Sequence, residues 1–187
     1  MAAAPAPAAL SPLELEHVVG WTGAYPTTLA CHPREDTTYV CALGASVVVC
    51  DVYDPHKQRF LRGHDADVCS LDVSASGRFA ASGQRRSALV ATGDAAVIVW
   101  DLARGSVVYT LFGLLESVTH VAFSPDERFL AAAAADNTIA VWDVTTGEQV
   151  RPAATRGHQR GAARGAACSR AAAPPRRRPP LTRPPPT

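Results

Sequence analysis

Side chains that could take part in acid–base chemistry are present in the sequence, but they are scattered. Asp65 and Asp67 flank the histidine of a Gly-His pair, His64, and two such carboxylates could act as an acid and a base. We interpret them as the solvated face of a turn, because aspartate is common in turns. The remaining histidines of the N-terminal 150 residues are isolated: His17, His32, His56 and His120.

The cysteines do not form a metal-binding pattern. No two are spaced as CxxC, and none lies with histidine at the spacing of a zinc site. Four of the five lie in apolar, strand-like segments, where a free cysteine packs as a small hydrophobic residue. The sequence also lacks a nucleophile elbow and a glycine-rich phosphate loop. We therefore predict a protein that is not an enzyme and has no cofactor, metal or small-molecule substrate.

The elements that must position these side chains recur along the chain. The phrase "VIVWD" at Val97–Asp101 returns as "IAVWD" at Ile139–Asp143. Leu61–Phe79 aligns without a gap on Leu111–Phe129, at an offset of about 50 residues, whereas the two Trp-Asp pairs are about 42 apart. The first copy therefore contains an insert, which we assign to Arg85–Gly93.

A third, fainter copy precedes these two. Thr27–Asp51 aligns without a gap on Thr119–Asp143, and Cys50 then stands where the other copies have tryptophan. Each copy consists of short alternating apolar runs separated by turn residues, which indicates antiparallel strands. Four strands in about 40–45 residues are typical of one blade of a β-propeller. We predict an all-β fold of about three four-stranded blades, with units near 27–61, 62–112 and 113–151.

The phrases "RGHDADVCSLDVSASGRFAASG" and "VIVWD" resemble the WD repeat. This resemblance implies a structural network in the second unit, formed by His64, Ser82, Asp94 and Trp100. In it, an aspartate carboxylate accepts a proton from the imidazole, whose other nitrogen meets the serine hydroxyl, and the hydroxyl accepts from the indole. Pairing of this kind is needed because an unpaired buried polar group costs about 1–3 kcal/mol.

The other two units depart from this pattern. In the third unit, Leu114 and Ala132 replace the histidine and the serine, and only a partial network of Asp136 and Trp142 remains. In the first unit, Cys50 replaces the tryptophan, and a glycine takes the place of the aspartate. We expect these units to depend more on apolar packing.

The N-terminal part has a more specific likeness. Leu13–Pro33 and Phe60–Gln84 resemble WD-repeat proteins of motile cilia and flagella, with the echinoderm-type microtubule-binding propellers as the nearest rival. The resemblance implies a non-catalytic structural protein of the axoneme, in the cytoskeleton, that binds tubulin inside the doublet microtubule through its propellers. It implies axonemal proteins as partners, with no membrane and no nucleic acid.

Two alternatives stay open. The chain could be a WD-repeat adaptor or scaffold that binds peptides, or a truncated product without independent function. Three blades cannot close a propeller, which typically has 4–8.

Composition divides the chain into three segments. Residues 1–11 are an Ala/Pro-rich segment that we predict to be disordered, and 12–151 form the partial propeller. Residues 152–187 are rich in Arg, Pro and Ala and contain no acidic residue, so we predict a disordered tail. This tail has three interpretations: a basic segment for acidic surfaces, a polyproline ligand, or the product of a frame error in a GC-rich gene.

Overall fold

The computed structural model describes residues 17–21, 23–87 and 94–151. The predicted N-terminal segment 1–11 and tail 152–187 lie outside the described residues, as does most of the predicted insert. The described part of the chain contains strands and turns and no helix, so it has no helix that could cross a membrane.

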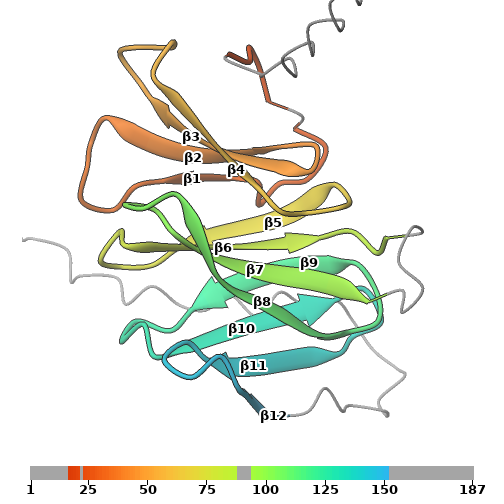
Figure 1. Cartoon of the computed structure of the whole chain (residues 1–187). Helices are drawn as coiled ribbons and strands as arrows, with labels where there is room; N and C mark the ends of the chain where they lie inside the picture. The colour runs from red at the N-terminus through yellow and green to blue at the C-terminus, as the bar shows by residue number, and fades with distance from the viewer. Residues whose placement is uncertain (1–16, 22, 88–93, 152–187) are drawn as a thin grey trace, which may run out of the picture. The chain divides into compact units, whose positions relative to one another are not determined.

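Twelve strands form three antiparallel sheets of four strands each, and each sheet is built from consecutive strands (Figure 1). The first sheet contains β1 (Leu29–Cys31), β2 (Thr38–Leu43), β3 (Ser46–Asp51) and β4 (Gln58–Arg62). The second contains β5 (Val68–Val73), β6 (Phe79–Gln84), β7 (Ala95–Asp101) and β8 (Ser106–Leu114). The third contains β9 (Val118–Phe123), β10 (Phe129–Ala134), β11 (Ile139–Asp143) and β12 (Gln149–Arg151). The prediction of an all-β partial propeller is confirmed.

Strand register corrects one detail of the repeat alignment. Tyr39 pairs with Cys50 in the first sheet, and Leu130 pairs with Trp142 in the third. The ungapped alignment instead matches Tyr39 with Ala131 and is wrong by one residue along β2. The turn before β2 is one residue longer than its counterpart before β10, and the hairpin after β2 is one residue shorter. As a result, Cys41 and not Val40 corresponds to Ala132.

Both faces of the second sheet are buried along β6 and β7. On β7, Ile98 and Trp100 pack toward the first sheet, whereas Val97 and Val99 pack toward the third. Side chains on a strand alternate between its two faces, so a strand buried on both must be apolar throughout. The first six residues of β7, "AAVIVW", meet that requirement and are buried, and the strand ends on the buried Asp101.

Polar contacts fix the turns of the first two sheets against each other. The imidazole of His32, in the turn after β1, donates from Nε2 to the carbonyl oxygen of Gly77 at 2.9 Å, while its Nδ1 accepts from the amide of Glu35 at 3.0 Å. Gly77 has a φ of 77°, and a Cβ atom there would lie 2.2 Å from the His32 ring. The histidine therefore has a structural role, and the turn requires glycine.

The fourth strand of the first sheet and of the second sheet each carry, at the same repeat position, a side chain that donates to backbone carbonyl oxygens of the next sheet. Arg59 on β4 donates to the carbonyl oxygens of Leu102 and Ala103 in the hairpin before β8. Tyr109, fifty residues later on β8, donates from its hydroxyl to the carbonyl oxygen of Thr145 at 2.9 Å. The repeat thus conserves the contact while the donor changes from a guanidinium to a phenol.

Replacement of Gly77 tests this boundary. We expect Gly77→Ala to destabilise the protein by about 2 kcal/mol or more, because the new methyl group meets the His32 ring and the left-handed backbone is strained. Gly44→Ala is the matched control: its φ is 56°, but the nearest atom would be 3.9 Å away. The control should lose only about 1 kcal/mol. Equal urea-unfolding midpoints for the two variants would contradict this account.

Candidate functional site

The polar site of the second sheet is assembled from three segments. His64 lies in the connection that leads from the first sheet to β5, Ser82 and Gln84 lie on β6, and Trp100 lies on β7. Ser82 is opposite Ile98, so Trp100, two residues further on, reaches it diagonally on the same face. All four side chains are buried.

The hydrogen bonds of this site run in one direction. The Trp100 indole donates to Ser82 Oγ at 2.7 Å, and this oxygen lies 2.6 Å from His64 Nε2. The other imidazole nitrogen, Nδ1, lies 2.8 Å from Gln84 Oε1. An amide oxygen only accepts, so Nδ1 carries the proton and Nε2 accepts from the serine.

The chain of hydrogen bonds ends on a carboxylate. Gln84 Nε2 donates to Asp65 Oδ1 at 2.5 Å. The hydroxyl of Ser87 and the Gln84 amide hold the pKa of Asp65 below its usual value. Burial lowers the pKa of His64, and this outweighs the opposing effects of Gln84 and Asp65. The histidine is therefore neutral at pH 7.

This arrangement has the outline of a serine–histidine relay, but its position argues against catalysis. A catalytic serine must reach a substrate carbonyl. Ser82 has no exposed surface, and its oxygen already contacts both the indole and the imidazole. Among the described residues, no group of three or more His, Cys, Asp or Glu side chains could hold a metal ion. We assign the network the role of satisfying buried polar groups.

The structure brings together three of the four residues in the implied network. His64, Ser82 and Trp100 are linked as the resemblance implies. Asp94 is half-buried and directly precedes β7, but the acceptor at His64 Nδ1 is Gln84. Sequence reasoning missed Gln84 because an aspartate at a suitable spacing was available, whereas a glutamine at the end of a strand gave no comparable signal.

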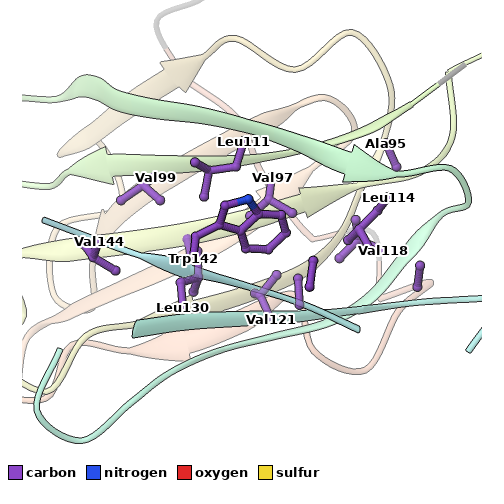
Figure 2. Packing of buried hydrophobic residues seen from close by; sticks show 14 residues of the cluster. Ala95, Val97, Val99, Leu111, Leu114, Val118, Val121, Leu130, Trp142 and Val144 are labelled. Atoms are coloured by element: carbon purple, nitrogen blue, oxygen red, sulfur yellow. The ribbon is translucent and has the colours of Figure 1, made fainter. Parts of the chain in front are cut away.

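The third sheet replaces the network with apolar side chains. The residues fifty positions after His64, Ser82 and Gln84 are Leu114, Ala132 and Ala134, and all three are buried. They belong to the cluster around Trp142 that fills the space between the second and third sheets (Figure 2). Asp136 stays at the adjoining turn, where its carboxylate accepts from the amide and hydroxyl of Thr138 at 3.0 and 2.6 Å.

The first sheet replaces the network in another way. By strand register, Cys41 and Leu43 correspond to Ser82 and Gln84, and Cys50 corresponds to Trp100. The thiols of Cys41 and Cys50 contact each other, and burial together with this contact raises the pKa of Cys41 to about 12. Both are buried small side chains, and the raised pKa keeps the Cys41 thiol neutral.

The two arginines at the start of the predicted insert are exposed and paired. A guanidinium nitrogen of Arg85 lies 3.6 Å from Oδ2 of Asp67. A guanidinium nitrogen of Arg86 lies 2.9 Å from Oε1 of Glu116, in the connection to the third sheet. The amide of Arg86 also donates to the Ser117 hydroxyl at 3.0 Å. These contacts attach the beginning of the insert to the neighbouring connection.

Comparison with known proteins agrees with the repeat seen in the second and third sheets. The family model described as "WD domain, G-beta repeat" matches residues 55–101 and 105–143. The chain carries WD repeats. Cilia- and flagella-associated protein 52 of Chlamydomonas reinhardtii is 38% identical over 141 residues, which are 74% of this chain and 22% of that protein. The human protein of that name is 31% identical over 140 residues, covering 73% of this chain and 22% of the relative.

A relative with a different name also matches the chain. Human WD repeat-containing protein 90 is 33% identical over 147 residues, covering 76% of this chain and 8% of the relative. The chain therefore spans about a fifth or less of the length of these curated relatives. The predicted recognition, a WD-repeat chain resembling cilia- and flagella-associated protein 52, is confirmed.

The third sheet provides a template for testing the network. We expect Ser82→Ala to destabilise the protein by about 2 kcal/mol or more, because it leaves His64 and Trp100 without their shared partner. The triple variant His64→Leu, Ser82→Ala, Gln84→Ala copies the third sheet. Its loss of unfolding free energy should be smaller, by at least about 1 kcal/mol, than the summed losses of the three single variants. Additive losses in chemical denaturation would show that the three side chains act independently.

The neutral state of His64 predicts a pH dependence. Its pKa is lowered in the folded protein, so between that value and the unfolded value of about 6.5 the unfolded chain binds more protons. Stability from this group is complete above about pH 6.5 and falls as the pH is lowered further. The triple variant lacks the histidine, so its stability should change less between pH 7 and 5.5. The same slope in both proteins would contradict the assignment.

Proposed function

We propose that this chain is a non-catalytic structural component of the motile cilium or flagellum that binds the tubulin of doublet microtubules through its WD-repeat sheets. The observation that carries the proposal is the match of about three quarters of the chain to cilia- and flagella-associated protein 52. The buried network supports a scaffold role, because its only hydroxyl nucleophile, Ser82, has no exposed surface.

The chain could bind a microtubule through its basic C-terminal segment or through its sheets, and the distribution of charge distinguishes these two modes. Residues 151–187 contain arginines and no acidic residue, whereas all the acidic residues lie before them. A basic segment binds acidic surfaces with little specificity, and that binding weakens strongly with salt. The proposal requires instead that the sheets themselves bind.

The test is co-sedimentation of the whole chain and of a chain ending at Val150 with purified axonemal doublets. We expect both proteins to sediment with doublets, and we expect binding of the shorter one to survive about 0.3 M salt. Singlet microtubules and free actin filaments serve as controls for nonspecific association. Binding that disappears with residues 151–187, or that is equal on all three filaments, would contradict the proposal.

A peptide-binding adaptor is the second candidate, and one cavity favours it. A largely apolar cavity of about 280 Å³ lies beside the first strands of the second and third sheets, lined by Tyr25, Pro26, Cys69, Val118 and neighbouring residues. Pockets with mostly apolar walls and a few polar groups are the usual binding sites of small apolar ligands and side chains. Capture of defined soluble partners, with no enrichment on doublets, would favour this function over the first.

A further inference from the structure

A cavity at the boundary between the second and third sheets combines apolar and charged walls. Its volume is about 450 Å³. The residues that line it come from the turns before β6 and β10, from the hairpins after β7 and β11, and from the first part of β8, the edge strand of the second sheet. Both sheets that enclose it are present in this chain, so the cavity does not arise from an end of the repeat series.

The apolar part of the cavity lies along β8. Val107 and Val108 line it and are 44% and 37% exposed. The whole strand, Ser106–Leu114, contains no charged residue, whereas β4, the corresponding strand of the first sheet, contains Arg59 and Arg62. Charged side chains are a usual means of keeping an edge strand from contacting other chains. β8 lacks this protection, so it suits contact with another polypeptide.

The carboxylates of the cavity are already paired. Asp101 accepts from the amide of Arg104 at 3.0 Å through Oδ1, and its Oδ2 lies 4.0 Å from Nε of Arg78. The Glu127 carboxylate accepts from the amide of Ser76, in the turn of the neighbouring sheet. Both carboxylates therefore stabilise the turns that carry them.

The guanidinium of Arg104 is different, because it is exposed and has no partner. Among the described residues, no ion pair or hydrogen bond involves this side chain. The hairpin itself does not require arginine: the Gly105 amide closes it by donating to the carbonyl oxygen of Asp101 at 2.8 Å, and the same bond closes the hairpin of the third sheet, which has Thr146 at this position. The cavity is left with unused guanidinium donors, for which a carboxylate is the complementary acceptor.

We propose that this cavity binds a segment of a partner protein in which an acidic side chain lies next to a large apolar one. The carboxylate pairs with Arg104, and the apolar side chain packs on Val107 and Val108. A volume of about 450 Å³ lies within the range of ordinary binding pockets and accommodates a few side chains. The proposal goes beyond the microtubule function and does not depend on it.

The test uses the peptide acetyl-Leu-Asp-Leu-amide, with acetyl-Leu-Asn-Leu-amide as a control that lacks only the charge. Each is added to the whole chain with carbon-13-labelled valine methyl groups. We expect the aspartate peptide to shift the methyl NMR signals of Val107 and Val108 with a dissociation constant on the order of 1 mM, and the asparagine peptide to bind about fivefold more weakly. The arginines of residues 151–187 also attract an acidic peptide, but shifts at these two valines report on the cavity.

Two arginine variants make the test specific. Arg104→Gln should weaken binding of the aspartate peptide by about fivefold. Arg62→Gln is the matched control, because Arg62 is also exposed but lies on β4 and does not line the cavity. Its binding should be unchanged. Absence of shifts at both valines, equal binding of the two peptides, or an equal effect of the two variants would overturn the proposal.

A second copy of this chain is the other possible occupant, and sedimentation velocity of the same samples detects it. Concentration-dependent dimers that Arg104→Gln abolishes would show that a second copy fills the cavity, which overturns the assignment to a different protein. Binding of the aspartate peptide, together with the same sedimentation behaviour for the natural sequence and Arg104→Gln, supports it.

Discussion

Burial of both faces of β6 and β7 in the second sheet is the constraint on which the rest of the structure depends. A strand covered on both sides has no solvent to satisfy its polar side chains, so every polar group on it needs a partner within the protein. β7 meets this condition with apolar residues and two paired polar side chains: the Trp100 indole donates to Ser82, and Asp101 at the end of the strand accepts from the amide of Arg104. Ser82 accepts from the Trp100 indole and donates to the neutral imidazole of His64, so both side chains are paired through one hydroxyl.

The three sheets solve this requirement in three ways. The second sheet extends the indole's hydrogen bond through Ser82, His64 and Gln84 to a carboxylate near the surface. The third sheet keeps its tryptophan and replaces the other three positions with apolar residues. The first sheet replaces the tryptophan as well. A partly built network would leave unpaired groups in a region of low dielectric, and this explains why the positions change together.

The strands, their grouping in fours and the pairing of His64 with Ser82 and Trp100 could all be predicted from the sequence. Periodicity identified the strands, and the resemblance to WD repeats identified the histidine. The register of β2 could not be predicted, because "YVCAL" is apolar on both faces and a shift of one residue leaves its pattern unchanged. Gln84 and Cys41 were missed for related reasons: one was hidden by a competing aspartate, the other by that shift.

The central claim, that a directional chain of hydrogen bonds holds a neutral histidine inside the second sheet, can be tested by one measurement. Nitrogen-15 NMR of the imidazole distinguishes the two neutral tautomers from each other and from the cation. The account predicts that His64 carries its proton on Nδ1 and becomes cationic only at a lower pH than a histidine of the unfolded chain, because burial lowers its pKa. A proton on Nε2, or a cationic imidazole at pH 6.5, would contradict it.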